Sequence, residues 1–223
     1  MKRNIVIATV AAVALIGGGT ATALAVTGDD ESSAAKKSSV QLKDDGRDDA
    51  AENTVEAKAA KVTAADAIKA ALAKTGGTAV SAELDEEDGG LVWGVDVLKG
   101  STWHDVEVDP GTGKVLGTWV DKDDDADDAA DTARLNTALK GASTSAEDAA
   151  RAAAAKGEVT SVDLDDDGTA TAWEVETTSA KGAESDWHVD LKTGKVTADR
   201  TGDHDDHDGR DDHDGQDDDG SDD

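Results

Sequence analysis

The chain has 223 residues, and 51 acidic residues against 22 basic ones give it a formal net charge of -29. Phosphate backbones repel such a polyanion, which argues against nucleic acid as a partner, whereas cations and basic proteins are attracted in a salt-sensitive way. The absence of Cys excludes disulfides, thiolate metal sites and cysteine nucleophiles. Phe and Tyr are also absent, so the five Trp residues are the aromatic core material.

The first 25 residues have the parts of an export signal. Lys2 and Arg3 precede an apolar run, and Ala23-Leu24-Ala25 matches the small-residue rule for cleavage. We therefore expect residues 1–25 to be a signal peptide. The alternative is an uncleaved membrane anchor, because the apolar stretch approaches the roughly 20 residues that span a bilayer. Either way, the remainder is expected to be secreted or to lie on the extracytoplasmic cell surface.

The segment after the signal is polar and charged. Residues 26–61 contain "GDDESSAAKKSS" and "KDDGRDDAAEN". Such a composition buries too little apolar surface to offset the entropy cost of ordering. It predicts a disordered spacer.

Residues 62–120 form the first predicted folded unit. In "VTAADAIKAALAK", Thr63 and Asp66 have nearly the spacing of a capping box, and Ile68 and Leu72 lie on one face of the helix that follows. Alternating strand residues and an acidic turn ending in Gly come next. The strand "LVWGVDV", a strand through Val106 and Val108 and the turn "PGTG" complete an antiparallel meander.

An acidic linker, 121–134, leads to a second unit, 135–199. Its helix segment "STSAEDAARAAAAK" has Thr144 and Glu147 at the predicted cap positions. The large apolar residues of the first helix are matched by Ala149 and Ala153, so part of the core volume is missing.

Two leucines just before the second unit could supply that volume. Leu135 and Leu139 are spaced as on one helix face. We expect a short extra helix that lies on the second unit's sheet.

The strands of the second unit repeat those of the first. "TAWEVET" aligns Trp173 and Val175 with Trp93 and Val95, and "DVEVDPGTGKV" recurs as "DWHVDLKTGKV". The fold class predicted is α+β, with two small repeated units, each one helix packed on an antiparallel β-meander.

The order of these features resembles the PepSY family. The resemblance covers Val62 to Val120 and Ser143 to Asp199. It rests on four features that occur in both units: the capped Ala-rich helix, the acidic hairpin ending in Gly, the strands "WGVDV" and "WEVET", and the endings "VDPGTGKV" and "VDLKTGKV". The family is known from propeptides of thermolysin-like metallopeptidases and from exported bacterial proteins. The resemblance implies a non-enzymatic binding or regulatory protein that restrains an exported peptidase, here expected to act in trans.

A calcium-loop pattern occurs in "DLDDDGTATAWE". Asp163, Asp165, Asp167 and Glu174 occupy ligand positions of the pattern. The flanking segments alternate as strands rather than helices, which favours an ordinary acidic hairpin turn over a specific calcium site.

The C-terminal segment, 200–223, is predicted to be a disordered tail rich in Asp and His. His204, His207 and His213 alternate with carboxylates, so the ligand types suit weak binding of Zn²⁺ or a similar ion. The alternative is a solubilising tail that condenses cations without a fixed site.

No catalytic motif accompanies the histidines His104 and His188, each of which follows a Trp. G-x-S-x-G, H-E-x-x-H and Gly-rich phosphate loops are all missing. We therefore expect a protein that is not an enzyme and has no cofactor other than weakly bound Ca²⁺ or Zn²⁺.

Two binding functions remain open. The outward face of the meander places acidic residues around Trp103, Glu107 and His188, a composition typical of a contact surface for a basic envelope protein or an exported peptidase. The alternative is an acidic envelope protein that buffers or senses divalent cations through its Asp- and His-rich segments.

Overall fold

The structure is a computed structural model, and it describes residues 37–42, 49–87, 90–121, 126–165 and 171–199. The helices in this part are α1 Asp49–Ala59, α2 Ala64–Thr75, α3 Ala126–Gly141 and α4 Ala146–Ala153. The first unit's strands are β1 Thr78–Ala79, β2 Ser81–Glu87, β3 Gly90–Lys99, β4 Thr102–Val108 and β5 Val115–Asp121. Those of the second are β6 Glu158–Leu164, β7 Ala172–Thr178, β8 Glu184–Asp190 and β9 Val196–Ala198.

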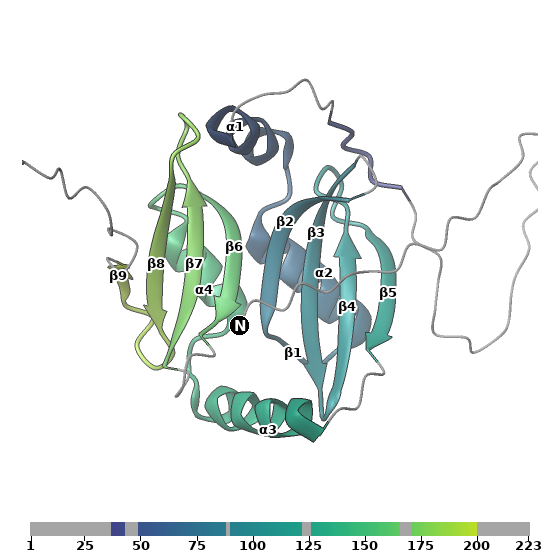
Figure 1. The fold of residues 1–223 in the computed structure, drawn as a ribbon, viewed down its shortest axis with the longest axis vertical. Helices are drawn as coiled ribbons and strands as arrows, with labels where there is room; N and C mark the ends of the chain where they lie inside the picture. Colours follow the sequence, from purple (N-terminus) through teal and green to yellow (C-terminus); the bar gives the residue numbers. More distant parts are fainter. Residues whose placement is uncertain (1–36, 43–48, 88–89, 122–125, 166–170, 200–223) are drawn as a thin grey trace, which may run out of the picture.

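All strands belong to one antiparallel sheet in the order β5-β4-β3-β2-β6-β7-β8-β9, with β1 pairing with β3. Helices α2 and α4 lie side by side on one face of this sheet (Figure 1). We call the opposite face the outer face. The predicted fold class is confirmed: each unit has one principal helix on an antiparallel meander.

The two units are joined at their first long strands. Ala82 of β2 lies opposite Val162 of β6, and the Leu164 amide donates a hydrogen bond to the Val80 carbonyl at 3.0 Å. This pairing could not be predicted from the sequence, because each strand carries the pattern of a half-buried strand in its own unit. The consequence is one continuous sheet that runs through both units.

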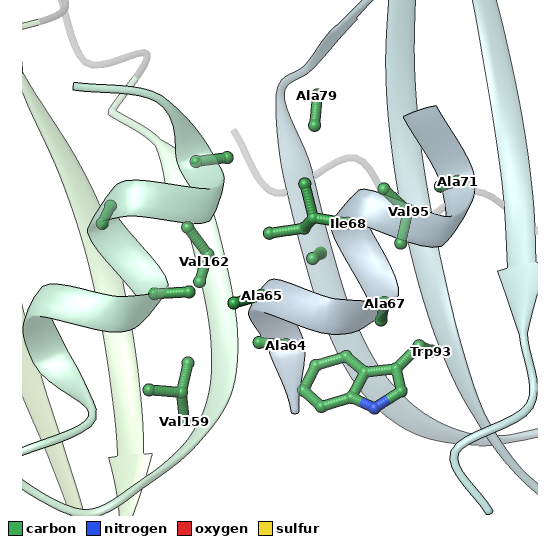
Figure 2. Packing of buried hydrophobic residues seen from close by; sticks show 14 of the residues in the cluster. Ala64, Ala65, Ala67, Ile68, Ala71, Ala79, Trp93, Val95, Val159 and Val162 are labelled. Carbon is green, nitrogen blue, oxygen red and sulfur yellow. The ribbon is translucent and has the colours of Figure 1, made fainter. Parts of the chain in front are cut away.

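Helices α2 and α4 pack into one hydrophobic core that both units share. Ala149 and Ala153 of α4 are fully buried, as are Ala67 and Ile68 of α2. Figure 2 shows the Ile68 side chain directed toward the second unit's helix. The volume that α4 lacks is therefore filled by the helix of the other unit, since small side chains let the two backbones approach closely.

The expectation that Leu135 and Leu139 lie on the second unit's sheet is wrong in its placement. Both are half-buried against the core, but α3 runs across the ends of the strands (Figure 1). Trp103 Nε1 donates to Thr132 Oγ1 at 3.0 Å, and the Asn136 side chain donates through Nδ2 to the Gly100 carbonyl at 3.0 Å. These bonds tie α3 to the first unit. The helix also takes in residues 126–134, which were predicted as linker.

Part of the predicted spacer, 26–61, is ordered. Residues 49–59 form α1, whose Asn53 side chain donates to Glu184, and Val40 accepts a hydrogen bond from the Leu91 amide at 2.9 Å. An added Cβ at Gly182 would overlap the backbone of α1. The segment has too few apolar residues for a core of its own, but it docks on surfaces that the two units provide.

The repeated phrase "VD..TGKV" builds the same turn in both units. Asp109 Oδ1 accepts the amides of Gly111 and Thr112 at 2.8 and 2.9 Å, and Asp190 Oδ1 accepts those of Lys192 and Thr193 at 3.1 and 2.8 Å. The Gly of each phrase has a positive φ, 72° at Gly113 and 65° at Gly194. Both units need the same short turn, with an Asp cap and a left-handed Gly, and this explains why the motif occurs twice in the sequence.

Each turn also holds the start of its helix. The Pro110 carbonyl accepts the Val62 amide at 2.9 Å, and the Leu191 carbonyl accepts the Thr144 amide at 2.9 Å. The α4 cap is Ser145 with Asp148, one residue after the predicted pair, because the Thr144 carbonyl accepts the indole N–H of Trp173 at 3.0 Å.

We expect Asp109→Ala to destabilise the protein by about 2–3 kcal/mol, because it removes the charged acceptor that Ser39, Gly111 and Thr112 share. Burial raises the pKa of Asp109, but hydrogen bonds from Ser39, Gly111 and Thr112 outweigh it and hold the pKa below its usual value. The stabilisation is thus present above about pH 4 and is lost as pH falls through the folded pKa. Urea denaturation at pH 7 and pH 3 measures both effects. If Asp109→Ala lowered the free energy of unfolding equally at pH 7 and pH 3, this role of Asp109 would be contradicted.

Candidate functional site

The outer face of the first unit carries a row of acidic side chains. Asp105 of β4 lies opposite Asp96 of β3 on one side and Trp119 of β5 on the other. Asp96 accepts a hydrogen bond from Ser81 Oγ at 2.8 Å. Directly opposed like charges repel across a sheet. The arrangement therefore concentrates negative charge beside an aromatic ring.

Asp105 has a perturbed pKa. Burial raises it first, and the neighbouring charges of Asp96 and Glu87 add to the effect, so that the pKa of Asp105 reaches about 7. A carboxyl group with this pKa changes charge near neutral pH. Its charge therefore responds to a cation placed beside it.

Two predicted contact residues of this unit are less accessible than expected. Glu107 points to the outer face, as predicted, but is only 6% exposed. Trp103 is half-buried and its indole N–H is bonded to Thr132 of α3. Substituting either residue would disturb the fold, so neither gives a clean test of a contact surface.

The third predicted contact residue, His188, lies elsewhere on the outer face. Strands β3, β2, β6 and β7 separate β4 from β8, which corresponds to about 24 Å at the usual strand spacing. The structure therefore does not bring His188 together with Trp103 and Glu107. His104, in contrast, points to the helix-covered face opposite Val97.

His188 lies in a second acidic group. Its Nε2 atom is 3.6 Å from Glu174 Oε1 and 3.8 Å from Asp199 Oδ2. Glu174 in turn pairs across the strands with Asp163. Burial, then the charge of Asp165, raises the pKa of Glu174, while His188 lowers it and Asp163 raises it further.

The predicted calcium loop is only partly described. Asp163 and Glu174 face each other on β6 and β7, two neighbouring strands of the hairpin, and Asp165 is close enough to perturb the pKa of Glu174. Asp167 lies outside the described residues. The flanking segments are strands, as the sequence indicated, and not the two helices of an EF-hand.

One acidic cluster was missed by sequence reasoning. Carboxylate oxygens of Glu52, Glu56 and Glu86 lie within 4.8 Å of one another where α1 meets the β2–β3 hairpin. Burial raises the pKa of Glu56, followed by the charges of Glu52, Asp85 and Glu86, among others. The i, i+4 spacing of the first two glutamates was visible in the sequence, but the docking of α1 was not.

The remaining candidate sites are one cavity and two segments outside the described residues. A cavity of about 250 Å³ lies between the start of α2 and the end of α4. Four alanines line it, and Thr63, Asp66, Arg151 and Glu158 are its polar residues. Asp66 and Thr63 bond each other as the helix cap. His204, His207 and His213, and the predicted signal 1–25, lie outside the described residues. No helix within the described ranges is long and apolar enough to cross a bilayer.

Comparison with known families identifies the repeated unit. The sequence profile of PepSY, described as "Peptidase propeptide and YPEB domain", matches residues 61–119 and 143–200, together more than half of the chain. The chain belongs to the PepSY family and contains two PepSY domains. The resemblance inferred from the repeated motifs is confirmed, with boundaries that agree within a few residues.

No curated protein matches the chain. Among solved structures, a candidate lipoprotein from Clostridium difficile 630 is 26% identical, with a TM-score of 0.40, and the match covers 61% of this chain and 91% of that chain.

Proposed function

We propose that this chain is an exported PepSY protein that binds an extracellular peptidase in trans and modulates its activity, without catalysing a reaction itself. The observation that carries the proposal is that both folded units match a family described by its peptidase propeptides. The features of an export signal in residues 1–25 and the absence of catalytic motifs from the sequence support it.

Electrostatics supports a basic target. The net charge is -29, and the outer face concentrates acids in both units, including Asp105 and Glu174. A partner with a positive surface would be steered toward this face at low ionic strength. Binding should weaken as salt is added.

The proposal is tested by affinity capture followed by an activity assay. The mature protein is immobilised, exposed to the culture medium of its source, and the retained proteins are identified. We expect a peptidase among them whose hydrolysis of a peptide substrate changes when the soluble protein is added. Retention of proteins without peptidase activity, or a peptidase unaffected by saturating protein, would contradict the proposal.

A second candidate function is divalent-cation binding at the cell envelope. The proximity of Asp163, Asp165 and Glu174 around the β6–β7 hairpin favours it. Calcium titration of a protein truncated before Asp203, compared with its Asp165→Asn variant, tests this hairpin apart from the tail. Saturable binding that the substitution abolishes would support the site. No binding at millimolar calcium, the weak end for extracellular modules, would reject it.

A further inference from the structure

The two ends of the sheet differ in length. Each unit has one edge occupied by the other unit, through the pairing of β2 with β6. The remaining edges are β9, with three residues, and β5, with seven. Among the described strands, β5 pairs only with β4. The long edge therefore belongs to the first unit.

Strand β5 lacks the usual protection of an edge. Natural edge strands carry charged residues or Pro that prevent another strand from pairing. The sequence from Val115 to Val120 is "VLGTWV", without charge and without Pro, and the one charged residue of β5 is Asp121 at its end. A register shift between Glu107 and Val108 interrupts the β4–β5 ladder near one end, but the pairs from Glu107 to Trp103 are regular. The backbone N–H and C=O groups along the edge of β5 that faces away from β4 are thus arranged to pair with an added strand.

The side chains beside this edge indicate the chemistry of a ligand. Trp119 of β5 lies directly opposite Asp105 on the outer face, and its ring folds across Gly117, where an added Cβ would overlap it. Side chains of an added strand alternate between the faces, so every second one would reach the outer face. A Lys or Arg there would meet an aromatic ring and then a carboxylate, which is a favourable site for a cation.

We propose that β5 binds an extended basic segment of another exported protein by strand addition, with a Lys or Arg of that segment over Trp119 and beside Asp105. A second copy of this chain is disfavoured as occupant, because each copy carries a net charge of -29 and would bring a further Asp105 to the same edge. The inference goes beyond the proposed function, since it holds whether or not the partner is a peptidase.

The test uses the full mature chain and two labelled peptides of alternating lysine and valine, identical except that one is N-methylated on alternate residues. N-methylation keeps the charge but removes backbone donors. We expect the unmodified peptide to bind at low salt at least about tenfold more tightly than the N-methylated one, measured by fluorescence anisotropy. Hydrogen exchange should show new protection of amides within Val115–Val120 on binding.

Variants separate the edge from general polyanion attraction. Trp119→Ala should weaken binding about tenfold, and Asp105→Asn should weaken it and flatten its salt dependence. Thr197→Ala on β9 is the matched control and should change nothing. Equal affinity for both peptides, no binding, or protection confined to other elements would overturn the proposal. Protection of β5 amides without peptide, in a protein that elutes as a dimer, would assign the edge to a second copy instead.

Discussion

Trp173→Ala is expected to lower the free energy of unfolding by about 3–5 kcal/mol, the usual cost of removing a large buried aromatic side chain. Trp173 is fully buried, and its indole N–H is bonded to the Thr144 carbonyl just before α4. The loss approaches the total stability of many small domains. Because β6 and α4 pack on the first unit, we expect one thermal transition that shifts down by about 10 °C or more.

The matched variant Trp173→Phe keeps most of the apolar area and loses the hydrogen bond, so about 1–2 kcal/mol should be lost. Circular dichroism melts of the three proteins provide the comparison. Two separate transitions in Trp173→Ala, with the first unit melting at the wild-type temperature, would contradict a shared core.

Asp105→Asn should stabilise the protein in a pH-dependent manner. The pKa of Asp105 is raised by burial and by Asp96 and Glu87 to about 7, so the folded state favours the neutral carboxyl. The wild type therefore loses stability as pH rises from about 4 to 7, by up to about 4 kcal/mol, whereas the amide has no such loss. Urea denaturation should show the two proteins nearly equal at pH 4 and the variant more stable at pH 8.

The equivalent position in the second unit supplies a control. Asp186 lies on the outer face of β8 as Asp105 lies on β4, but it is exposed. Since exposed charges remain solvated, Asp186→Asn should have a much smaller effect on stability at any pH. A difference between Asp105→Asn and the wild type that is constant from pH 4 to pH 8 would show that this carboxyl is not buried near like charges.

Much of the fold could be predicted because local signals and repetition agree. The alternation around Trp93 and Trp173 assigned the buried face of each meander, and the structure places both side chains in the core. The turn phrase identified the two copies, since an Asp cap and a left-handed Gly leave few alternative residues.

The joining of the units could not be predicted in the same way. Strands β2 and β6 carry ordinary half-buried patterns, and nothing local specifies which edge will pair with which. By periodicity alone, Ala149 and Ala153 leave core volume unfilled, whereas in the structure these small side chains let α4 approach α2. The role of small residues in a contact between two helices depends on long-range packing, which periodicity alone does not predict.

The candidate site was predicted by residue type more than by position. Acidic residues on the outer face were expected, and Asp105 and Glu174 lie there. The burial of Glu107 and the use of Trp103 to hold α3 depend on contacts between distant segments. Trp119 was not predicted as a contact residue, because the residues next to it in the sequence are uncharged.

Hydrogen exchange of the Leu164 amide tests most directly whether the two PepSY domains form one body. This amide donates to the Val80 carbonyl across the β2–β6 junction. We predict that it exchanges only through global unfolding, at the same rate and with the same denaturant dependence as amides of β3, an interior strand of the first unit. Exchange of Leu164 that is fast and insensitive to denaturant, while β3 and β7 stay protected, would show that the domains separate at this junction.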